Sequence, residues 1–156
     1  MKQVALFPGT FDPITFGHIE ILKRGLLMFD EIVIGMGTNT SKNTMFTAEQ
    51  RLRWMKEYFA DEKRIKVETF KGLTVNYAKS INAKFILRGL RSSSDFEYEK
   101  TIDLLNKHLN PNVETLYFIS SPATAHISST LVREIIRFRG HLEGLVPENI
   151  IQEVYK

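Results

Sequence analysis

The residues best suited to chemistry lie near the start of the chain, in Gly17-His18 and the turn before them. An apolar stretch typical of a buried strand, Val4–Phe7, precedes this turn, and an amphipathic helical pattern follows it. Gly17 has no Cβ, so the backbone there can approach a ligand closely. His18 falls in the first turn of the expected helix, where free N–H groups and the helix dipole favour anions. The pattern predicts a phosphate-handling site, although the sequence has no Walker A loop.

Other residues with phosphate chemistry follow other apolar stretches. Arg88 ends one such stretch and Arg91 comes three residues later, and a guanidinium group suits bidentate phosphate binding. Lys42 lies in a polar loop, and hydroxyl side chains at Ser128–Thr130 precede a helical pattern. Each has a plainer interpretation: a solvated lysine, N-capping hydroxyls, and arginines in surface ion pairs. The acidic partners for such pairs would be Asp95, Glu97 or Glu99.

Strand-like and helical patterns alternate along the whole chain. The expected strands are Val4–Phe7, Glu31–Met36, Ile65–Phe70, Phe85–Arg88 and Glu114–Ile119. Several of their centres are continuously apolar, as in parallel strands buried on both faces. The alternation predicts an α/β fold: a single Rossmann-like domain over residues 1–156, with a five-stranded parallel sheet and helices on both faces. In such folds, ligands bind beyond the carboxyl ends of the strands, where the residues above fall.

Capping signals mark where the helices should begin. They are a capping box at Thr47–Gln50, a second at Ser94–Glu97, an N-cap at Thr74, an N-cap at Ser128 or Ser129, and a first helical position at Pro147.

The composition excludes several classes of function. The chain has 156 residues, 43% hydrophobic and 25% charged, which fits an ordinary globular domain. Without cysteine, disulfides, thiolate metal sites and cysteine nucleophiles are excluded. A net charge of +3 is too mild to indicate nucleic acid as a partner. No secretory signal pattern and no apolar run of about 20 residues occurs, so we expect a cytoplasmic protein with no membrane partner.

Taken together, the motifs resemble those of a known superfamily. Gly9–His18, Arg88–Arg91 and Ile127–Arg133 are similar to the nucleotidyltransferase α/β superfamily. Arg88–Glu99, together with Lys42 and further matches to the chain's end, resembles the bacterial phosphopantetheine adenylyltransferase family more narrowly. This resemblance implies reversible transfer of AMP from ATP to 4′-phosphopantetheine. The products would be dephospho-coenzyme A and pyrophosphate, formed by direct attack without a covalent intermediate.

The same resemblance implies a role for each matching residue. The catalytic residues would be Thr10, His18, Lys42 and Arg91, with His18 stabilising charge on the α-phosphate. The ATP site would comprise Thr10, Phe11, His18, Gly89, Leu90, Arg91, Glu99, Thr124, Ala125, His126, Ile127, Ser128, Ser129 and Thr130. The acceptor site would comprise Thr10, Lys42, Thr74, Arg88 and Asn106, with Glu134 as a weaker candidate.

Several of these residues have more than one interpretation. Thr124–His126 stand where many relatives carry an aromatic residue near Ile127, and His126 could replace that ring. Without the resemblance, Glu99 reads as part of a solvated helix face. Asp12 could help to hold a metal or brace the turn before Pro13, and we favour the turn. A helix start disfavours a protonated His18 and a triphosphate favours it, so its protonation state stays open.

No His, Asp or Glu cluster has transition-metal spacing, so no protein metal site is predicted. We expect Mg²⁺ to bind mainly through the ATP phosphates. The resemblance also implies a homohexamer, a dimer of trimers, with coenzyme A as feedback inhibitor. The main rival function is another reaction of the superfamily, by a glycerol-phosphate cytidylyltransferase or a mononucleotide adenylyltransferase. A non-catalytic nucleotide sensor is a second alternative.

Overall fold

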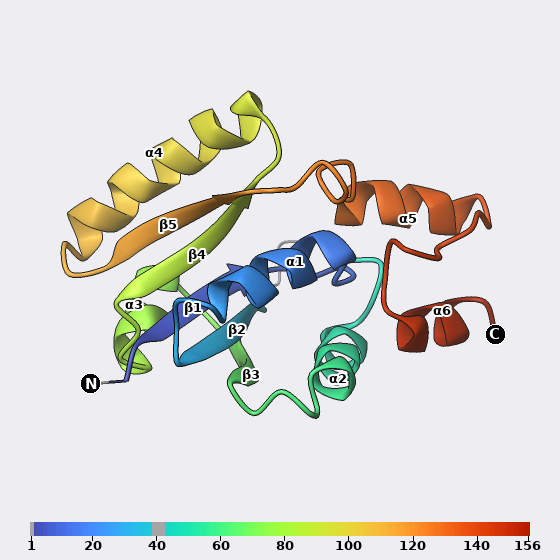
Figure 1. Cartoon of the computed structure of the whole chain (residues 1–156), viewed down its shortest axis with the longest axis horizontal. Helices are drawn as coiled ribbons and strands as arrows, with labels where there is room; N and C mark the ends of the chain where they lie inside the picture. The colour runs from blue at the N-terminus through green and yellow to red at the C-terminus, as the bar shows by residue number, and fades with distance from the viewer. Residues whose placement is uncertain (1, 39–42) are drawn as a thin grey trace.

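A computed structural model describes residues 2–38 and 43–156 of the chain. Strands and helices alternate along it, as predicted (Figure 1). The strands in the described part are β1 (Val4–Gly9), β2 (Glu31–Gly37), β3 (Ile65–Phe70), β4 (Phe85–Leu90) and β5 (Glu114–Ile119). The helices there are α1 (Phe16–Gly25), α2 (Ala48–Tyr58), α3 (Thr74–Ser80), α4 (Ser93–Leu109), α5 (Ser129–Arg137) and α6 (Glu148–Val154). No described helix is long and apolar enough to span a bilayer.

The five strands form one parallel sheet in the order β3-β2-β1-β4-β5. The chain first runs outward from β1 through β2 to β3, and it then crosses back to place β4 on the other side of β1. The direction of winding therefore reverses between β1 and β4. In open α/β sheets, this reversal is where ligands bind.

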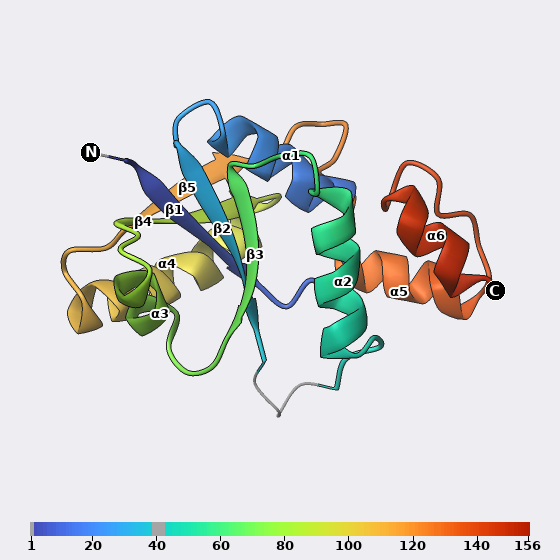
Figure 2. The same cartoon turned by 90° about the horizontal axis from the view of Figure 1, so that it is seen from below.

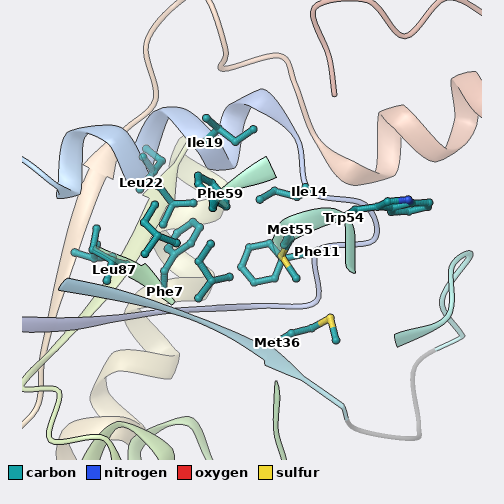
Figure 3. Packing of buried hydrophobic residues seen from close by; sticks show 14 of the residues in the cluster. Phe7, Phe11, Ile14, Ile19, Leu22, Met36, Trp54, Met55, Phe59 and Leu87 are labelled. Carbon is teal, nitrogen blue, oxygen red and sulfur yellow. The ribbon is translucent and has the colours of Figure 1, made fainter. Parts of the chain in front are cut away.

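Strand residues alternate between two apolar clusters, one on each face of the sheet. Ala5 and Phe7 belong to the larger cluster, which includes residues of α1, α2, α5 and α6. Figure 3 shows part of it, including Phe7 and Phe11. Leu6 points the other way, into a smaller cluster with Val75 of α3. Helix α4 lies beside α3 on that second face (Figure 2). The predicted fold class, a parallel sheet with helices on both faces, is confirmed.

Two of the predicted helix starts are found at the expected residues. Thr47 caps α2, and its hydroxyl and backbone pair reciprocally with Gln50 at 3.1 and 3.0 Å, so the capping box is confirmed. Ser128 caps α5 and accepts a hydrogen bond from Leu131.

Three other helix boundaries differ from the prediction. Helix α4 begins at Ser93, because Ser92 is extended and its hydroxyl accepts the N–H of Asp95. Three consecutive serines offer the same capping chemistry, so the predicted box at residues 94–97 is wrong. Thr74 is the first residue of α3, not its N-cap, and Pro147 is the N-cap of α6, not its first residue.

Strands β1 and β4 part near the middle of the sheet. They pair only at Ala5 with Phe85 and at Leu6 with Ile86, whereas β1 pairs with β2 along all six of its residues. Pro8 has no N–H to offer a neighbouring strand, and its carbonyl accepts a hydrogen bond from Arg88 Nη1 at 2.7 Å. The carboxyl ends of β1 and β4 are therefore separated at the point where the winding reverses.

Candidate active site

The parting of β1 and β4 opens two adjoining cavities at the carboxyl end of the sheet. The α4-side cavity, of about 340 Å³, is bordered by β1, α3, α4 and β5. The α1-side cavity, of about 370 Å³, is bordered by the β1–α1 turn, the end of β4 and the start of α5. The two share one wall, formed by Pro8, Gly9, Thr10, Arg88, Tyr98 and Glu99. Two ligands in these cavities would meet at that wall.

His18 lines the α1-side cavity from the first turn of α1. The backbone N–H of Thr15 donates to its Nδ1 at 3.0 Å, and the Thr15 hydroxyl lies at the same distance. A backbone N–H can only donate, so Nδ1 accepts and the proton of the neutral ring is on Nε2. The ring packs edge-on against Phe11 and Phe7, at 5.2 and 6.3 Å between centroids. These contacts fix both the orientation and the tautomer of His18.

The surroundings of His18 also set its charge. Burial first, and then the nearby positive charges of Arg88 and Arg91, lower the pKa of His18 from 6.5 to about 4. The side chain is therefore neutral at pH 7 in the unliganded protein. The question that the sequence left open is answered for this state, in which His18 offers an uncharged Nε2–H donor.

The turn before α1 is held in an unusual conformation. Phe11 has φ of 49°, in the left-handed region that an aromatic residue rarely adopts. Its ring lies under Gly9, where a Cβ would approach the ring to 2.8 Å. The glycine at position 9 is thus required by this packing. Phe11 is only 3% exposed, so its ring belongs to the core although the residue borders the cavity.

Arg88 is held firmly by a buried carboxylate. Its Nε and Nη2 donate to Glu99 of α4 at 2.5 to 3.0 Å, and its Nη1 donates to the Pro8 carbonyl. Glu99 is 6% exposed, so the interpretation of this residue as part of a solvated helix face is wrong. A guanidinium group has five N–H bonds, and the contacts within the described chain use three of them. Two N–H groups of a pre-oriented fork therefore remain for a ligand.

Arg91 stands nearer to solvent on the α1-side cavity. Its Nε donates to Asp95 at 3.2 Å, and its backbone N–H donates to the same oxygen at 3.0 Å. This is the surface ion pair that the sequence offered as an alternative for Arg91. With 41% of the Arg91 side chain exposed, the pair itself contributes little stability. Its effect is to hold the Arg91 side chain at the border of the α1-side cavity.

The start of α5 is fastened to the β1–α1 turn. Ser129 Oγ donates to the Pro13 carbonyl at 2.8 Å, and Arg133 Nη1 donates to the Asp12 carbonyl at 2.7 Å. Arg133 Nη2 also donates to Thr130 Oγ1 at 3.2 Å. Ser128, Ser129 and Thr130 at this helix start border the same cavity as His18, and the first turn of a helix has backbone N–H groups without intrahelical partners.

Asp12 braces this region through its carboxylate, and the residue is buried, with 4% of its surface exposed. One carboxylate oxygen accepts the N–H of Met45 at 2.8 Å, and the other accepts the N–H of Phe46 at 3.0 Å. These contacts support the interpretation of Asp12 as a structural residue of the turn. Among the residues that the structure describes, no group of three or more acidic or histidine side chains could hold a metal ion.

Comparison with known proteins identifies the family. The model of the cytidylyltransferase-like family matches residues 6–135. The phosphopantetheine adenylyltransferase of Christiangramia forsetii is 49% identical, over 95% of this chain and 97% of its own length. That of Flavobacterium johnsoniae is 48% identical, over 94% and 95%, and that of Caldanaerobacter subterraneus is 43% identical, over 97% and 95%. The chain belongs to the phosphopantetheine adenylyltransferase family. The family resemblance is thereby confirmed, and with it the assignment to nucleotidyltransferase enzymes.

The residues expected from that family divide between the two cavities. The α4-side cavity contains the predicted acceptor residues Thr10, Thr74, Arg88 and Asn106. The α1-side cavity contains these predicted ATP residues: Thr10, Phe11, His18, Gly89, Arg91, Glu99, Ile127, Ser128, Ser129 and Thr130. Four predicted ATP residues, Leu90 and Thr124–His126, border neither cavity, and the same holds for Glu134. Lys42 lies outside the described residues.

Three residues without a predicted role also help to build the site. Arg133 and Tyr98 border the cavities, and Arg51 of α2 donates to the Thr10 carbonyl at 2.5 Å. Arg133 could have been found from its spacing, since it lies one helical turn after Thr130. Arg51 carried no such signal, because it is 41 residues from Thr10 and sits in an ordinary charged helix pattern.

Proposed function

We propose that this chain transfers AMP reversibly from ATP to 4′-phosphopantetheine, giving dephospho-coenzyme A and pyrophosphate. Family membership over nearly the whole chain supports this reaction. The observation that carries the assignment of the two substrates is the pair of cavities with one shared wall. ATP would occupy the α1-side cavity and the pantetheine arm the α4-side cavity. The acceptor phosphate and the α-phosphate would then meet beside Thr10 and Arg88.

The acceptor phosphate is held by the two N–H groups that Arg88 has left after pairing with Glu99 and Pro8. Thr10 and Lys42 complete this phosphate site, and Thr74 and Asn106 contact the arm. On the other side, Arg91 and the start of α5 hold the β- and γ-phosphates of ATP. These roles follow from the family's pattern, and the lining of each cavity supports them for the described residues.

The chemistry is a single displacement. An oxygen of the acceptor phosphate attacks the α-phosphorus, the bond to the β-phosphate oxygen breaks, and pyrophosphate leaves. His18 Nε2–H donates to an α-phosphate oxygen as negative charge builds there. Positioning and charge stabilisation of this kind supply most of the rate in phosphoryl-type transfer.

We further propose that Mg²⁺ arrives with ATP and is held mainly by phosphate oxygens and water. Asp12 is not assigned as a ligand of the ion, because both of its carboxylate oxygens already accept backbone N–H groups. When bound, the ion would neutralise charge on the phosphates.

We also propose that the chain works in the cytoplasm as one domain over residues 1–156, assembled into a homohexamer. Apolar side chains exposed along α4 support an assembly, with Leu104 64% and Leu105 56% exposed. Coenzyme A would act as feedback inhibitor, because it carries both a pantetheine arm and a nucleotide and could fill both cavities.

A substrate screen tests the proposed reaction. Pyrophosphate release is measured with ATP and 4′-phosphopantetheine, with CTP and glycerol 3-phosphate, and with ATP and nicotinamide mononucleotide. We expect turnover only with the first pair. Replacing His18 by Ala should lower turnover by on the order of 10²–10³ without unfolding the protein. Activity confined to CTP, or ATP binding without turnover for any acceptor, would overturn the proposal.

A further inference from the structure

We propose that Glu20 is a positioning residue for ATP, because it fastens the segment after β5 to the helix that carries His18. Glu20 borders neither cavity. The inference rests on the proposed function, and it assigns Glu20 to the ATP side of the reaction alone.

The Glu20 carboxylate gathers several donors at one point. Both of its oxygens lie 3.3 Å from the backbone N of Ser121, and one accepts a short hydrogen bond from the Thr124 hydroxyl. Arg24 Nη1 donates to the other oxygen at 3.2 Å. The hydroxyls of Ser121 and Thr124 are themselves 3.3 Å apart. A single carboxylate thus closes the turn that follows β5 and ties it to α1.

Arg24 adds contacts to this cluster, which we call the Glu20 clamp, from one helical turn further along α1. Its Nη1 donates to the Ile119 carbonyl at 2.7 Å, and its guanidinium lies 5.1 Å from the centre of the Phe118 ring. Glu20 and Arg24 are four residues apart and therefore lie on the same face of α1. Together they fix the end of β5 and the turn after it against this helix.

The segment held by Glu20, residues 121–126, connects two parts of the wall of the α1-side cavity. Ser120 lies directly before this segment and Ile127 directly after it, and both border the cavity. Near Gly17 this segment and the residue after it come close to the start of α1, since a Cβ at Gly17 would lie 3.7 Å from the Thr124 carbonyl oxygen and 3.1 Å from that of Ile127. The clamp therefore fixes the spacing between His18 and the start of α5, which are the two sides proposed to hold ATP.

The charge of Glu20 suits this role. Burial raises the pKa of the carboxyl, but the hydrogen bonds from Thr124, Ser121 and Arg24 outweigh burial and hold the pKa below its usual value. The carboxylate is ionised at neutral pH, so each of these bonds is charge-assisted. The acceptor side of the site contains no part of this cluster.

Steady-state kinetics with each substrate varied in turn test the proposal. Glu20→Ala should raise the KM for ATP by about tenfold, the effect of losing one or two charge-assisted hydrogen bonds. We expect kcat and the KM for 4′-phosphopantetheine to change by less than about twofold on the same reasoning. Glu20→Gln, which keeps one acceptor oxygen, should be intermediate. Lys23→Ala is the matched control, because Lys23 is exposed on the same helix.

Thr124→Val provides an independent variant, because it removes the hydroxyl donor and leaves Glu20 in place. Its effect on the KM for ATP should be smaller than that of Glu20→Ala, and the double variant should resemble Glu20→Ala alone. If Glu20→Ala does not fold, Glu20→Gln and Thr124→Val carry the comparison. Equal changes in both KM values, no change in either, or simple additivity would overturn the role of Glu20. A wild-type protein that forms no dephospho-coenzyme A would instead overturn the proposed function.

Discussion

Protonation of His18 should destabilise the folded protein. Its pKa is lowered to about 4 in the fold and is near 6.5 when the chain is unfolded. The unfolded state therefore binds a proton at His18 before the folded state does. The stability associated with neutral His18 is fully present above pH 6.5, falls as the pH decreases toward 4, and is wholly lost below it.

The size of the effect follows from the two pKa values. Their separation corresponds to about 3 kcal/mol at 1.36 kcal/mol per pKa unit. This is a ceiling, because the ring keeps some solvent contact through the cavity. Between pH 7 and pH 5, the linkage relation predicts a loss of about 2 kcal/mol from His18 alone.

Urea denaturation at pH 7.0, 6.0 and 5.0 measures this loss. Carboxylates also titrate as the pH falls, so the comparison is between the wild type and His18→Asn. Asparagine keeps an oxygen that can accept the N–H of Thr15, but it does not titrate. The variant should lose about 2 kcal/mol less than the wild type over this range. His141→Asn is the matched control, since the His141 side chain is fully exposed, and it should follow the wild type.

Parallel loss of stability in the wild type and in His18→Asn would refute this reasoning. A pKa above 6 for His18 in a proton NMR titration of the unliganded protein would refute it independently. Either result would show that the fold does not hold the pKa of His18 far below its ordinary value. The neutral Nε2–H donor would then lose its support.

Three further changes probe the site, and a fourth probes the metal. Glu99→Gln weakens the hold on Arg88, so the KM for 4′-phosphopantetheine should rise about tenfold; an unchanged value would show that Arg88 needs no such partner. Gly17→Ala presses a Cβ against the Ile127 carbonyl, so steady-state kinetics should show a several-fold higher KM for ATP and an unchanged acceptor KM. Asp12→Ala leaves the N–H groups of Met45 and Phe46 without their acceptor. In urea denaturation this should lower the free energy of unfolding by about 2–4 kcal/mol. A loss below about 1 kcal/mol would contradict the bracing role of Asp12. Chelation by EDTA should abolish pyrophosphate release, and Mg²⁺ should restore it.

Much of the fold could be predicted from the sequence, because each strand carries its own signal. The continuously apolar centres of β2 and β4 need burial on both faces, and that requirement alone implies helices above and below the sheet. The rule that ligands bind at the carboxyl ends of parallel strands then places Thr10, Arg88 and Ser128 at one edge of the sheet. The burial of the strands follows from local apolar patterns, and the placing of these residues at one edge follows from the general topology of parallel sheets.

Other features depended on partners far away in the sequence. Glu99 reads as a solvated residue because its partner Arg88 belongs to a different element, which the helical pattern around Glu99 does not reveal. The bond from Thr124 to Glu20 joins residues 104 positions apart, and no local pattern links the two. The start of α4 was misplaced for another reason, since three successive serines made the local signal degenerate.

The early separation of β1 from β4 has a consequence for local stability. Beyond Leu6 and Ile86 the two strands no longer share ladder hydrogen bonds, although they lie in the middle of the sheet. Amide groups at these strand ends should therefore exchange with solvent more readily than those on the fully paired β1–β2 side. A substrate bound between the two strand ends occupies the space where their hydrogen bonds are absent. Because it binds the folded form, it raises the free energy of local unfolding there. Hydrogen exchange at these strand ends should therefore slow when a substrate binds, and it should slow more than on the fully paired β1–β2 side.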